Sequence, residues 1–188
     1  MKEAARELRQ QPATMGIVLH RAWLYDVFLK LVSFGKERTY RERVLDLVGL
    51  RPGESVLDIG CGTGTLAIAA ARRVGASGKV CGVDASPEML SRARKKATKA
   101  GAEIAFKNGI VEALPFADGQ FDAVLSTMML HHLGPKARLE CAQEVRRVLR
   151  PGGRVLIVDF AKPAEGKKGI LDHFHHHGYV NLKDLVGL

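Results

Sequence analysis

The sequence predicts an α/β domain built on a doubly wound parallel sheet of about five strands. Beyond residue 50, short apolar runs alternate with helical segments at the spacing of strand-helix-strand units. One run, residues 154–160, is almost continuously apolar, as a parallel strand buried on both faces should be. Another run leads directly into a loop with three glycines and then into a helix. The 188 residues suit one domain of this class.

The expected elements follow in order along the chain. Residues 1–50 predict helices, which end at Arg51-Pro52-Gly53. Helices are also expected at residues 65–74 and 86–100, the second with Ser86 as N-cap, and from Pro135 to Pro151-Gly152-Gly153. Strands are expected at residues 55–59, 79–83, 104–107, 121–126 and 154–160. Because crossovers between parallel strands are right-handed, ligands are expected at the carboxyl ends of these strands.

Composition and charge limit the classes of protein to consider. The net charge of +9 would attract nucleic acid, anionic lipid or acidic metabolites, but the basic residues are spread along the chain. We interpret them as solvated helix faces and do not expect nucleic-acid binding. Cys61, Cys81 and Cys141 are far apart without a CxxC pair, which favours reduced thiols in the cytoplasm. No apolar run is long enough for a membrane span, and the N-terminus lacks the pattern of a secretory signal.

The strongest functional signal lies where the first expected strand ends. Asp58 is followed by Gly60, Gly62 and Gly64, and these glycines permit tight turns and close approach of a ligand to the backbone. The start of the next helix offers free N–H groups to an anionic group. The spacing is GxGxG rather than the GxGxxG of dinucleotide-binding proteins, because position 65 is threonine. No Walker lysine followed by serine or threonine is present.

The second signal is Asp84, at the end of the second expected strand. A carboxylate there can accept hydrogen bonds from both hydroxyls of a ribose, and its position 24 residues after Gly60 favours that role. The alternative is a structural one, in which Asp84 caps the entry to the helix near Ser86.

These residues belong to a series of motifs that resembles a known family. The motifs VLDIGCGTG, GVDASPEML, EALPFADGQFDAVLS, LHHL and EVRRVLRPGGRVLIVDF occur in order between residues 56 and 160. Together they resemble class I methyltransferases that depend on S-adenosylmethionine (SAM), in the type 11 group that includes ubiquinone/menaquinone C-methyltransferases. The resemblance covers roughly residues 20–165. It implies a Rossmann-like sheet in the strand order 3-2-1-4-5, preceded by N-terminal helices, with SAM as cofactor.

The resemblance also implies roles for individual residues. Asp58 and the loop that follows it would hold the amino-acid end of SAM, and Asp84 would bind the ribose. Ala85 and Met89 would flank the adenine, and Tyr25 would close over the methionine portion as an aromatic lid. The remaining members of the expected cofactor site are Gly60, Cys61, Gly62, Gly64, Gly109, Ile110, Val111 and Ser126.

The sequence departs from the family in two places. Relatives carry an acid that accepts from the adenine amino group where this chain has Ile110, so the backbone N–H of Val111, or Asn108, would have to serve instead. After residue 160 the sequence predicts only a loop and one helix at about residues 169–186, so we expect strands six and seven of the family to be missing. The expected organisation is a helical lid over residues 1–50, a SAM-binding core over 51–165 and a C-terminal helix over 166–188.

The expected function is methyl transfer to a small molecule, such as a quinone precursor or a lipid. His131 and His132 follow the fourth strand and are the candidate general bases, because a histidine titrates near neutral pH. A packing role for these histidines is the alternative. A SAM-binding module without catalysis, and an RNA or protein methyltransferase, are the competing functions. A homo-oligomer could cover the exposed edge of the sheet.

No metal site is expected. The cluster of His173, His175, His176 and His177 lacks an evident third ligand on one helix face.

Overall fold

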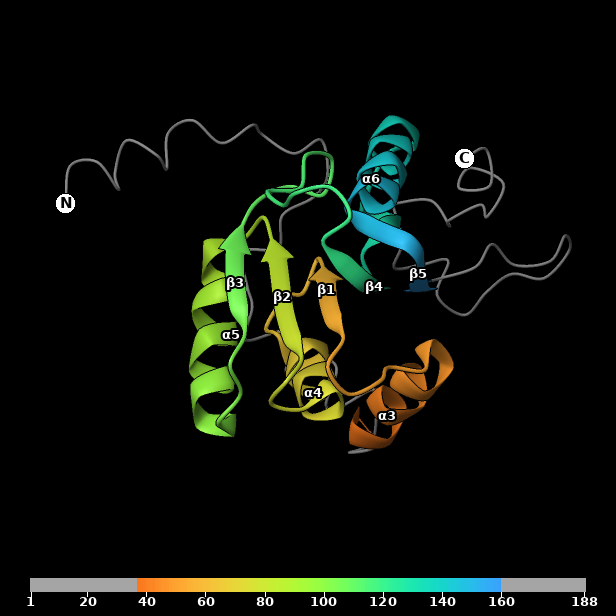
Figure 1. Cartoon of the computed structure of the whole chain (residues 1–188). Helices are drawn as coiled ribbons and strands as arrows, with labels where there is room; N and C mark the ends of the chain where they lie inside the picture. The colour runs from red at the N-terminus through yellow and green to blue at the C-terminus, as the bar shows by residue number, and fades with distance from the viewer. Residues whose placement is uncertain (1–36, 160–188) are drawn as a thin grey trace, which may run out of the picture.

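The computed structural model describes residues 37–159, and they form one parallel sheet with helices on both faces (Figure 1). The strands are β1 Ser55–Ile59, β2 Lys79–Asp84, β3 Ala105–Asn108, β4 Phe121–Thr127 and β5 Leu149–Val158. Their order is β3-β2-β1-β4-β5, and every neighbouring pair is parallel. The predicted fold class and strand order are therefore confirmed.

Two apolar clusters lie on the two faces of the sheet. The helices are α3 Glu37–Val48, α4 Thr65–Val74, α5 Pro87–Ala100 and α6 Pro135–Val148, with a short 3-10 helix, η1, at Leu130–His132. Buried residues of α3, α4 and α5 form one cluster, and those of α6 form the other. Along β1, Val56 belongs to the first cluster, whereas Leu57 and Ile59 belong to the second. This alternation buries the strand on both faces.

The register of the strands brings their carboxyl ends to one edge. Ile59 of β1 pairs with Val83 of β2 and with Ser126 of β4, and Thr127 pairs with Val158 of β5. The chain order reverses between β1 and β4, and such a switch point is where open α/β sheets bind their ligands. None of the helices among residues 37–159 is long and apolar enough to cross a membrane.

The structure differs from the sequence-based expectation around residues 148–154. Helix α6 ends at Val148, earlier than expected, and β5 begins at once with Leu149. Leu149 pairs with Phe121, but Arg154 pairs with Ala123, so the intervening residues form an irregularity in β5. Pro151-Gly152-Gly153, expected to precede the strand, lies inside this irregularity, where Gly152 has a φ of 77°. The other boundaries agree with the expectation or differ from it by at most two residues.

Several sequence-based expectations lie outside the described residues. They include Tyr25, most of the helical lid at residues 1–50 and the C-terminal helix at residues 166–188. The division into lid, core and C-terminal helix therefore stays a prediction.

Arg154 joins β5 to the end of α3 and to the entry of β1. Its guanidinium donates to the carbonyl oxygens of Val48 and Gly49, at 2.6 and 2.8 Å. It also donates to both carboxylate oxygens of Glu54, at 3.0 and 2.7 Å. This bond lowers the pKa of Glu54, whose side chain is only 15% exposed. One side chain thus satisfies carbonyls at a helix end that have no partner within the helix.

We expect Arg154→Met to lower the free energy of unfolding by about 2–3 kcal/mol, because it leaves two carbonyls without their donor and leaves Glu54 with only the N–H of Arg51. The control is Arg150→Met, which removes a pair with Asp122 in which the arginine side chain is 49% exposed. We expect that loss to be about 0–1 kcal/mol. Urea denaturation measures both, and equal losses would contradict the role given to Arg154.

Candidate functional site

The carboxyl edge of the sheet brings together most of the residues that the sequence singled out. Residues 60–64 connect β1 to α4, and Asp84 ends β2. Residues 109–111 follow β3, and His131 and His132 lie in η1, just after β4. Four segments that are far apart in the sequence therefore meet at the switch point of the sheet.

The glycine loop is open at its middle residue. Gly62 has a φ of 52°, and a Cβ atom there would meet nothing within 4 Å. The backbone can therefore be approached closely at this point, which is the property that the sequence analysis expected of the loop. The loop is held to β2, because the N–H of Cys61 donates to the carbonyl of Val83 at 3.0 Å.

The two outer glycines serve packing rather than access. A Cβ atom on Gly64 would lie 2.8 Å from the ring of Phe106 and 2.9 Å from the Cβ of Ala93. A Cβ atom on Gly60 would overlap the side chain of Met129. The loop can therefore lie close to β3, α5 and the segment after β4 only because these positions carry no side chain.

Asp84 accepts hydrogen bonds from two backbone segments. Its Oδ2 accepts from the N–H of Gly62 at 2.8 Å, and its Oδ1 accepts from the N–H of Ser86 at 2.9 Å. Burial raises the pKa of Asp84, and these two bonds oppose that effect. Ser86 itself caps α5 by accepting from the N–H of Met89. The structure is therefore compatible with both interpretations of Asp84 from the sequence. Its carboxylate contacts the entry of α5, and it lies at the carboxyl edge of the sheet, where ligands are expected.

Asp58 is a buried carboxylate with one oxygen lacking any hydrogen-bond partner. The residue is 1% exposed, and its Oδ2 has no partner. The N–H of Ala67, in α4, supplies one hydrogen bond to the carboxylate. Burial, with a further contribution from the charge of Asp84, raises the pKa of Asp58 to about 7. Such a group favours a cationic ligand that could reach its second oxygen.

The segment after β3 packs against the end of β2. The side-chain amide of Asn108 donates to the carbonyl of Asp84 at 3.0 Å, and the N–H of Gly109 donates to the same carbonyl at 3.2 Å. Ile110 is half-buried, and Val111 is buried in the cluster on the α6 side. The residues expected beside an adenine are therefore neighbours of the residue expected at the ribose.

Three other predicted cofactor residues have buried side chains, namely Cys61, Met89 and Ser126. Cys61 is buried with its sulfur against Gly82, and burial raises the pKa of its thiol. Met89 is 3% exposed, whereas Ala85 is half-buried. Ser126 is 1% exposed, and its hydroxyl has no hydrogen-bond partner. Any contact of Cys61 with a ligand would therefore use its backbone.

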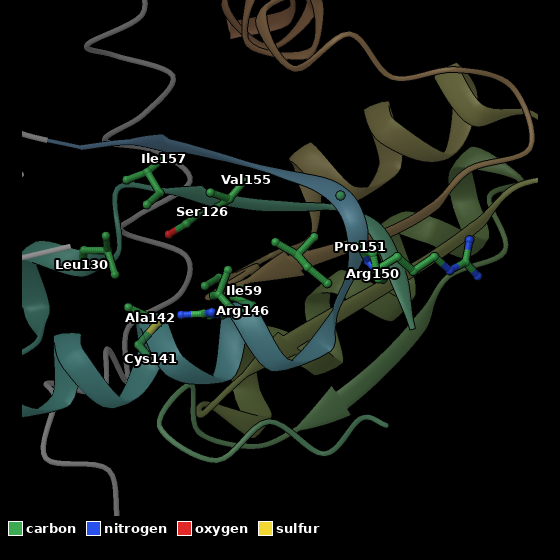
Figure 2. A pocket seen from close by; sticks show the side chains of 13 residues that line it. Ile59, Ser126, Leu130, Cys141, Ala142, Arg146, Arg150, Pro151, Val155 and Ile157 are labelled. Atoms are coloured by element: carbon green, nitrogen blue, oxygen red, sulfur yellow. The ribbon is translucent and has the colours of Figure 1, made fainter. Parts of the chain in front are cut away.

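The hydroxyl of Ser126 faces a cavity of about 600 Å³ between α6, β4 and β5, as Figure 2 shows. Its lining is largely apolar and includes Ile59, Leu130, Val155 and Ile157. Ile59, Ser126 and Leu130 lie at the carboxyl end of the strands, so the cavity begins beside the candidate site.

His131 is paired with a buried acid that the sequence analysis did not single out. Its Nδ1 lies 2.7 Å from the Oδ1 of Asp159, and the two side chains are 8% and 4% exposed. The Oδ2 of Asp159 accepts from the N–H groups of Met129 and His131. Because a carboxylate only accepts, Nδ1 carries the hydrogen when Asp159 is ionised, which makes Nε2 the basic atom of neutral His131. The ring of His132 packs on the ring of His131, with the two ring centroids 3.9 Å apart.

The sequence did contain a signal for Asp159. It is an acid immediately after an apolar parallel strand. Asp58 and Asp84 likewise lie at or near the ends of β1 and β2. A second residue that was missed is Lys96, whose ammonium donates to the hydroxyl of Thr63 in the glycine loop at 2.7 Å. Its signal was weak, because Lys96 is one of several basic residues on α5.

Within residues 37–159, no group of three or more histidine, cysteine or acidic side chains could hold a metal ion. The cluster of His173, His175, His176 and His177 lies outside that range.

Comparison with known proteins gives a consistent result. A family model described as a methyltransferase domain matches residues 56–153. A ubiquinone/menaquinone biosynthesis C-methyltransferase, UbiE, from Klebsiella pneumoniae is 37% identical over 165 residues, which cover 86% of this chain and 65% of that relative. The chain therefore spans less than two thirds of the length of this relative.

Two solved structures are also similar. One is a SAM-dependent methyltransferase from Aquifex aeolicus, with a TM-score of 0.60 and 29% identity; the match covers 69% of this chain and 68% of that one. The other is a cyclase, SpnF, with a TM-score of 0.62 and 27% identity; the match covers 69% of this chain and 47% of that one.

The raised pKa of Asp58 gives a stability prediction. The unfolded carboxyl titrates near 4 and the folded one near 7, so the folded state binds more protons between these values. Stability from this group is present below about pH 4 and is lost as the pH rises through 7. We expect Asp58→Asn to become more stable relative to the original chain over that window, by up to about 1.4 kcal/mol per pH unit.

Urea denaturation from pH 5 to 8 measures this difference in the free energy of unfolding. The control is Asp122→Asn, because the N–H of Ser55 lowers the pKa of Asp122, so both states are ionised throughout the range. The difference in the free energy of unfolding between Asp122→Asn and the original chain should not change with pH. A pH-independent difference for Asp58→Asn as well would refute the assignment.

Proposed function

Because this chain belongs to the family of methyltransferase domains, we propose that it transfers a methyl group from SAM to a small-molecule acceptor. The family and its cofactor agree with the sequence-based prediction. The observation that carries the proposal is the open backbone at Gly62 next to two carboxylates at the same edge, the buried Asp58 and the half-buried Asp84.

The residues present fit SAM. The unpartnered Oδ2 of Asp58 suits the ammonium of the methionine portion, and a cation beside it would favour the ionised carboxylate. Asp84 keeps acceptor capacity for ribose hydroxyls, since each of its oxygens accepts one bond from the backbone. Gly62 gives the cofactor access to the loop, and the segment at Asn108–Val111 is the side expected for adenine. When bound, SAM supplies a methyl group that is already electrophilic.

We propose an apolar acceptor related to a quinone precursor. The relative from Klebsiella pneumoniae is named for such a substrate class, and the cavity that begins at Ser126 is lined largely by apolar side chains. The pair of His131 and Asp159 supports a general base for an acceptor hydroxyl, because Asp159 orients the imidazole and sets its tautomer. In this proposal His131 acts on the acceptor, and Asp159 is a positioning residue.

We also propose a reducing cytoplasmic compartment and an acceptor that is not nucleic acid. All three cysteines are free thiols, and two of them are buried. The basic residues of α5 that lie on its exposed side, namely Arg92, Arg94, Lys95 and Lys99, form a solvated helix face. The two edge strands of the described sheet, β3 and β5, would be the places for a homo-oligomer to form.

A second candidate function is SAM binding without methyl transfer. One structural neighbour is a cyclase, and a shared fold does not establish a shared reaction. Ile110, at a position where the family resemblance implies an acid, also favours this candidate. Formation of S-adenosylhomocysteine in the presence of an acceptor separates it from the first.

Calorimetric titration with SAM and S-adenosylhomocysteine tests the proposed cofactor site. We expect saturable binding by the original chain and at least about tenfold weaker binding by Gly62→Ala, because the added methyl group occupies the open side of the loop. The control is Gly101→Ala at the end of α5, where φ is 61° and the added Cβ also meets nothing. Both variants should lose about 1 kcal/mol of stability. Equal affinities for all three chains would refute the site.

Methyl transfer tests the proposed reaction and the base. With a panel of quinols and phenols, we expect S-adenosylhomocysteine to form, and His131→Gln to lower kcat by about 10²–10⁴. Asp159→Asn should also lower kcat and change the pH profile, while SAM affinity stays the same in both variants. Unchanged turnover in His131→Gln would contradict the role of His131 as the general base. Binding without turnover of any acceptor would favour the second candidate.

A further inference from the structure

Helix α5 extends one basic side chain to the glycine loop. The ammonium of Lys96 donates to the hydroxyl oxygen of Thr63 at 2.7 Å. Thr63 is 4% exposed and directly follows Gly62, the open residue of the loop. Lys96 is half-buried, whereas Lys95 and Lys99 on the same helix are exposed. Lys96 therefore differs from the solvated lysines of α5, because its charge is held against a buried hydroxyl.

The packing of α5 explains why Lys96 reaches the loop. Ala93 lies three residues earlier on α5, so the two side chains share a face of the helix. A Cβ atom on Gly64 would lie 2.9 Å from the Cβ of Ala93, so this face packs directly on the loop. The guanidinium of Arg94 holds the helix to β3, because it donates to the carbonyl of Phe106 at 3.0 Å. Lys96 therefore extends from a firmly placed helix that is in close contact with the loop.

Two carboxylates make the surroundings of the loop negative. Asp58 is buried next to the loop, and the half-buried Asp84 accepts from the N–H of Gly62 at 2.8 Å. Burial is the main cause of the raised pKa of the Cys61 thiol, and the charges of both carboxylates raise it further, whereas the charge of Arg94 opposes them. The loop therefore attracts a cation, and an anion beside it gains from a positive charge held nearby.

The amino-acid end of SAM carries both an ammonium and a carboxylate. Asp58 suits the ammonium, because its Oδ2 has no hydrogen-bond partner. The carboxylate, in contrast, is repelled by Asp58 and Asp84. Lys96 holds a positive charge at the loop through its bond to Thr63. A hydroxyl that accepts from an ammonium also becomes a stronger donor, so Thr63 passes part of this effect to its surroundings.

We propose that Lys96 is a positioning residue for the amino-acid end of SAM. Its bond to Thr63 holds the open backbone at Gly62 in place. Its charge offsets the repulsion between the carboxylate of SAM and the two acids of the site. Lys96 acts on the loop from α5, through Thr63, rather than as a contact of the cofactor. This inference rests on the proposed function, because it concerns how the same site holds its cofactor.

The test compares two thioether ligands that differ at the amino-acid end. S-adenosylhomocysteine carries this end, whereas methylthioadenosine has a methyl group in its place. Calorimetric titration measures both affinities for the full 188-residue chain and its variants. Lys96→Met removes the charge and the donor, whereas Lys96→Arg keeps both. The matched control is Lys99→Met, which removes an exposed lysine from the same helix.

We expect Lys96→Met to bind S-adenosylhomocysteine about tenfold more weakly than the original chain and to bind methylthioadenosine equally well. Lys96→Arg should recover most of the lost affinity, because it restores a positive donor. Lys99→Met should match the original chain for both ligands. Thr63→Val should also weaken the binding of S-adenosylhomocysteine. Because Lys96 acts through Thr63, the double variant should lose less affinity than the two single losses combined.

Amide hydrogen exchange in the absence of ligand gives a second readout of the loop. The N–H of Gly62 is bonded to Asp84, which protects it from exchange while the loop stays in place. We expect this N–H to exchange faster in Lys96→Met than in the original chain, and at the original rate in Lys99→Met. Equal exchange rates in all three chains would overturn the role of Lys96 in holding the loop.

Unchanged affinity of Lys96→Met for S-adenosylhomocysteine would overturn the inference and leave the proposed function intact. Equal losses for both ligands would also overturn it, because they indicate a general disturbance of the fold rather than a role at the amino-acid end. Fully additive losses at Lys96 and Thr63 would contradict the action of Lys96 through Thr63. If the original chain bound neither SAM nor S-adenosylhomocysteine, the proposed function would fail, and this inference would fail with it.

Discussion

The site depends on the constraint that parallel strands end at one edge of the sheet. Three of the strands carry an acid at or near that end, namely Asp58, Asp84 and Asp159. Water would stabilise these charges in an unfolded chain, but here each lies in a largely buried position. The fold meets this cost differently for each acid. Asp159 accepts from two backbone N–H groups and an imidazole, and Asp84 accepts from two backbone N–H groups. Asp58 keeps an unpartnered oxygen.

The number of hydrogen-bond partners distinguishes Asp84 and Asp159, which hold parts of the structure together, from Asp58, which favours a cation. The bonds to Asp84 fix the glycine loop relative to the start of α5, and those to Asp159 fix η1 relative to β5. Burial and the nearby charge of Asp84 raise the pKa of Asp58 to about 7, and a single backbone hydrogen bond opposes them. A cationic ligand group would complete the set of partners, so ligand binding and stability are expected to be linked at this residue.

The sequence predicted the fold well because the governing signals are local. Apolar runs, the glycines and the cap at Ser86 each determine the structure of their own neighbourhood. The strand boundary at Leu149 was misplaced, because Pro151-Gly152-Gly153 is typical of a turn and only the pairing of Leu149 with Phe121 extends the strand across it. The bond between His131 and Asp159 joins residues 28 apart, and the one between Lys96 and Thr63 joins residues 33 apart. No local pattern contains such pairs.

The same limit applies to the direction of side chains at the site. Gly60 and Met129 lie 69 positions apart in the sequence, yet a methyl group on Gly60 would overlap the Met129 side chain. Met128, just before it, adopts a φ of 53°, which is unusual for a residue other than glycine and is sustained by its neighbours. Its N–H donates to the carbonyl of Val158, so the turn after β4 is fixed to the end of β5. The loop expected to hold the cofactor thus packs directly on the segment that carries His131. A change at Gly60 would therefore displace the candidate base as well as the cofactor loop, and its effects on binding and turnover should not be separable.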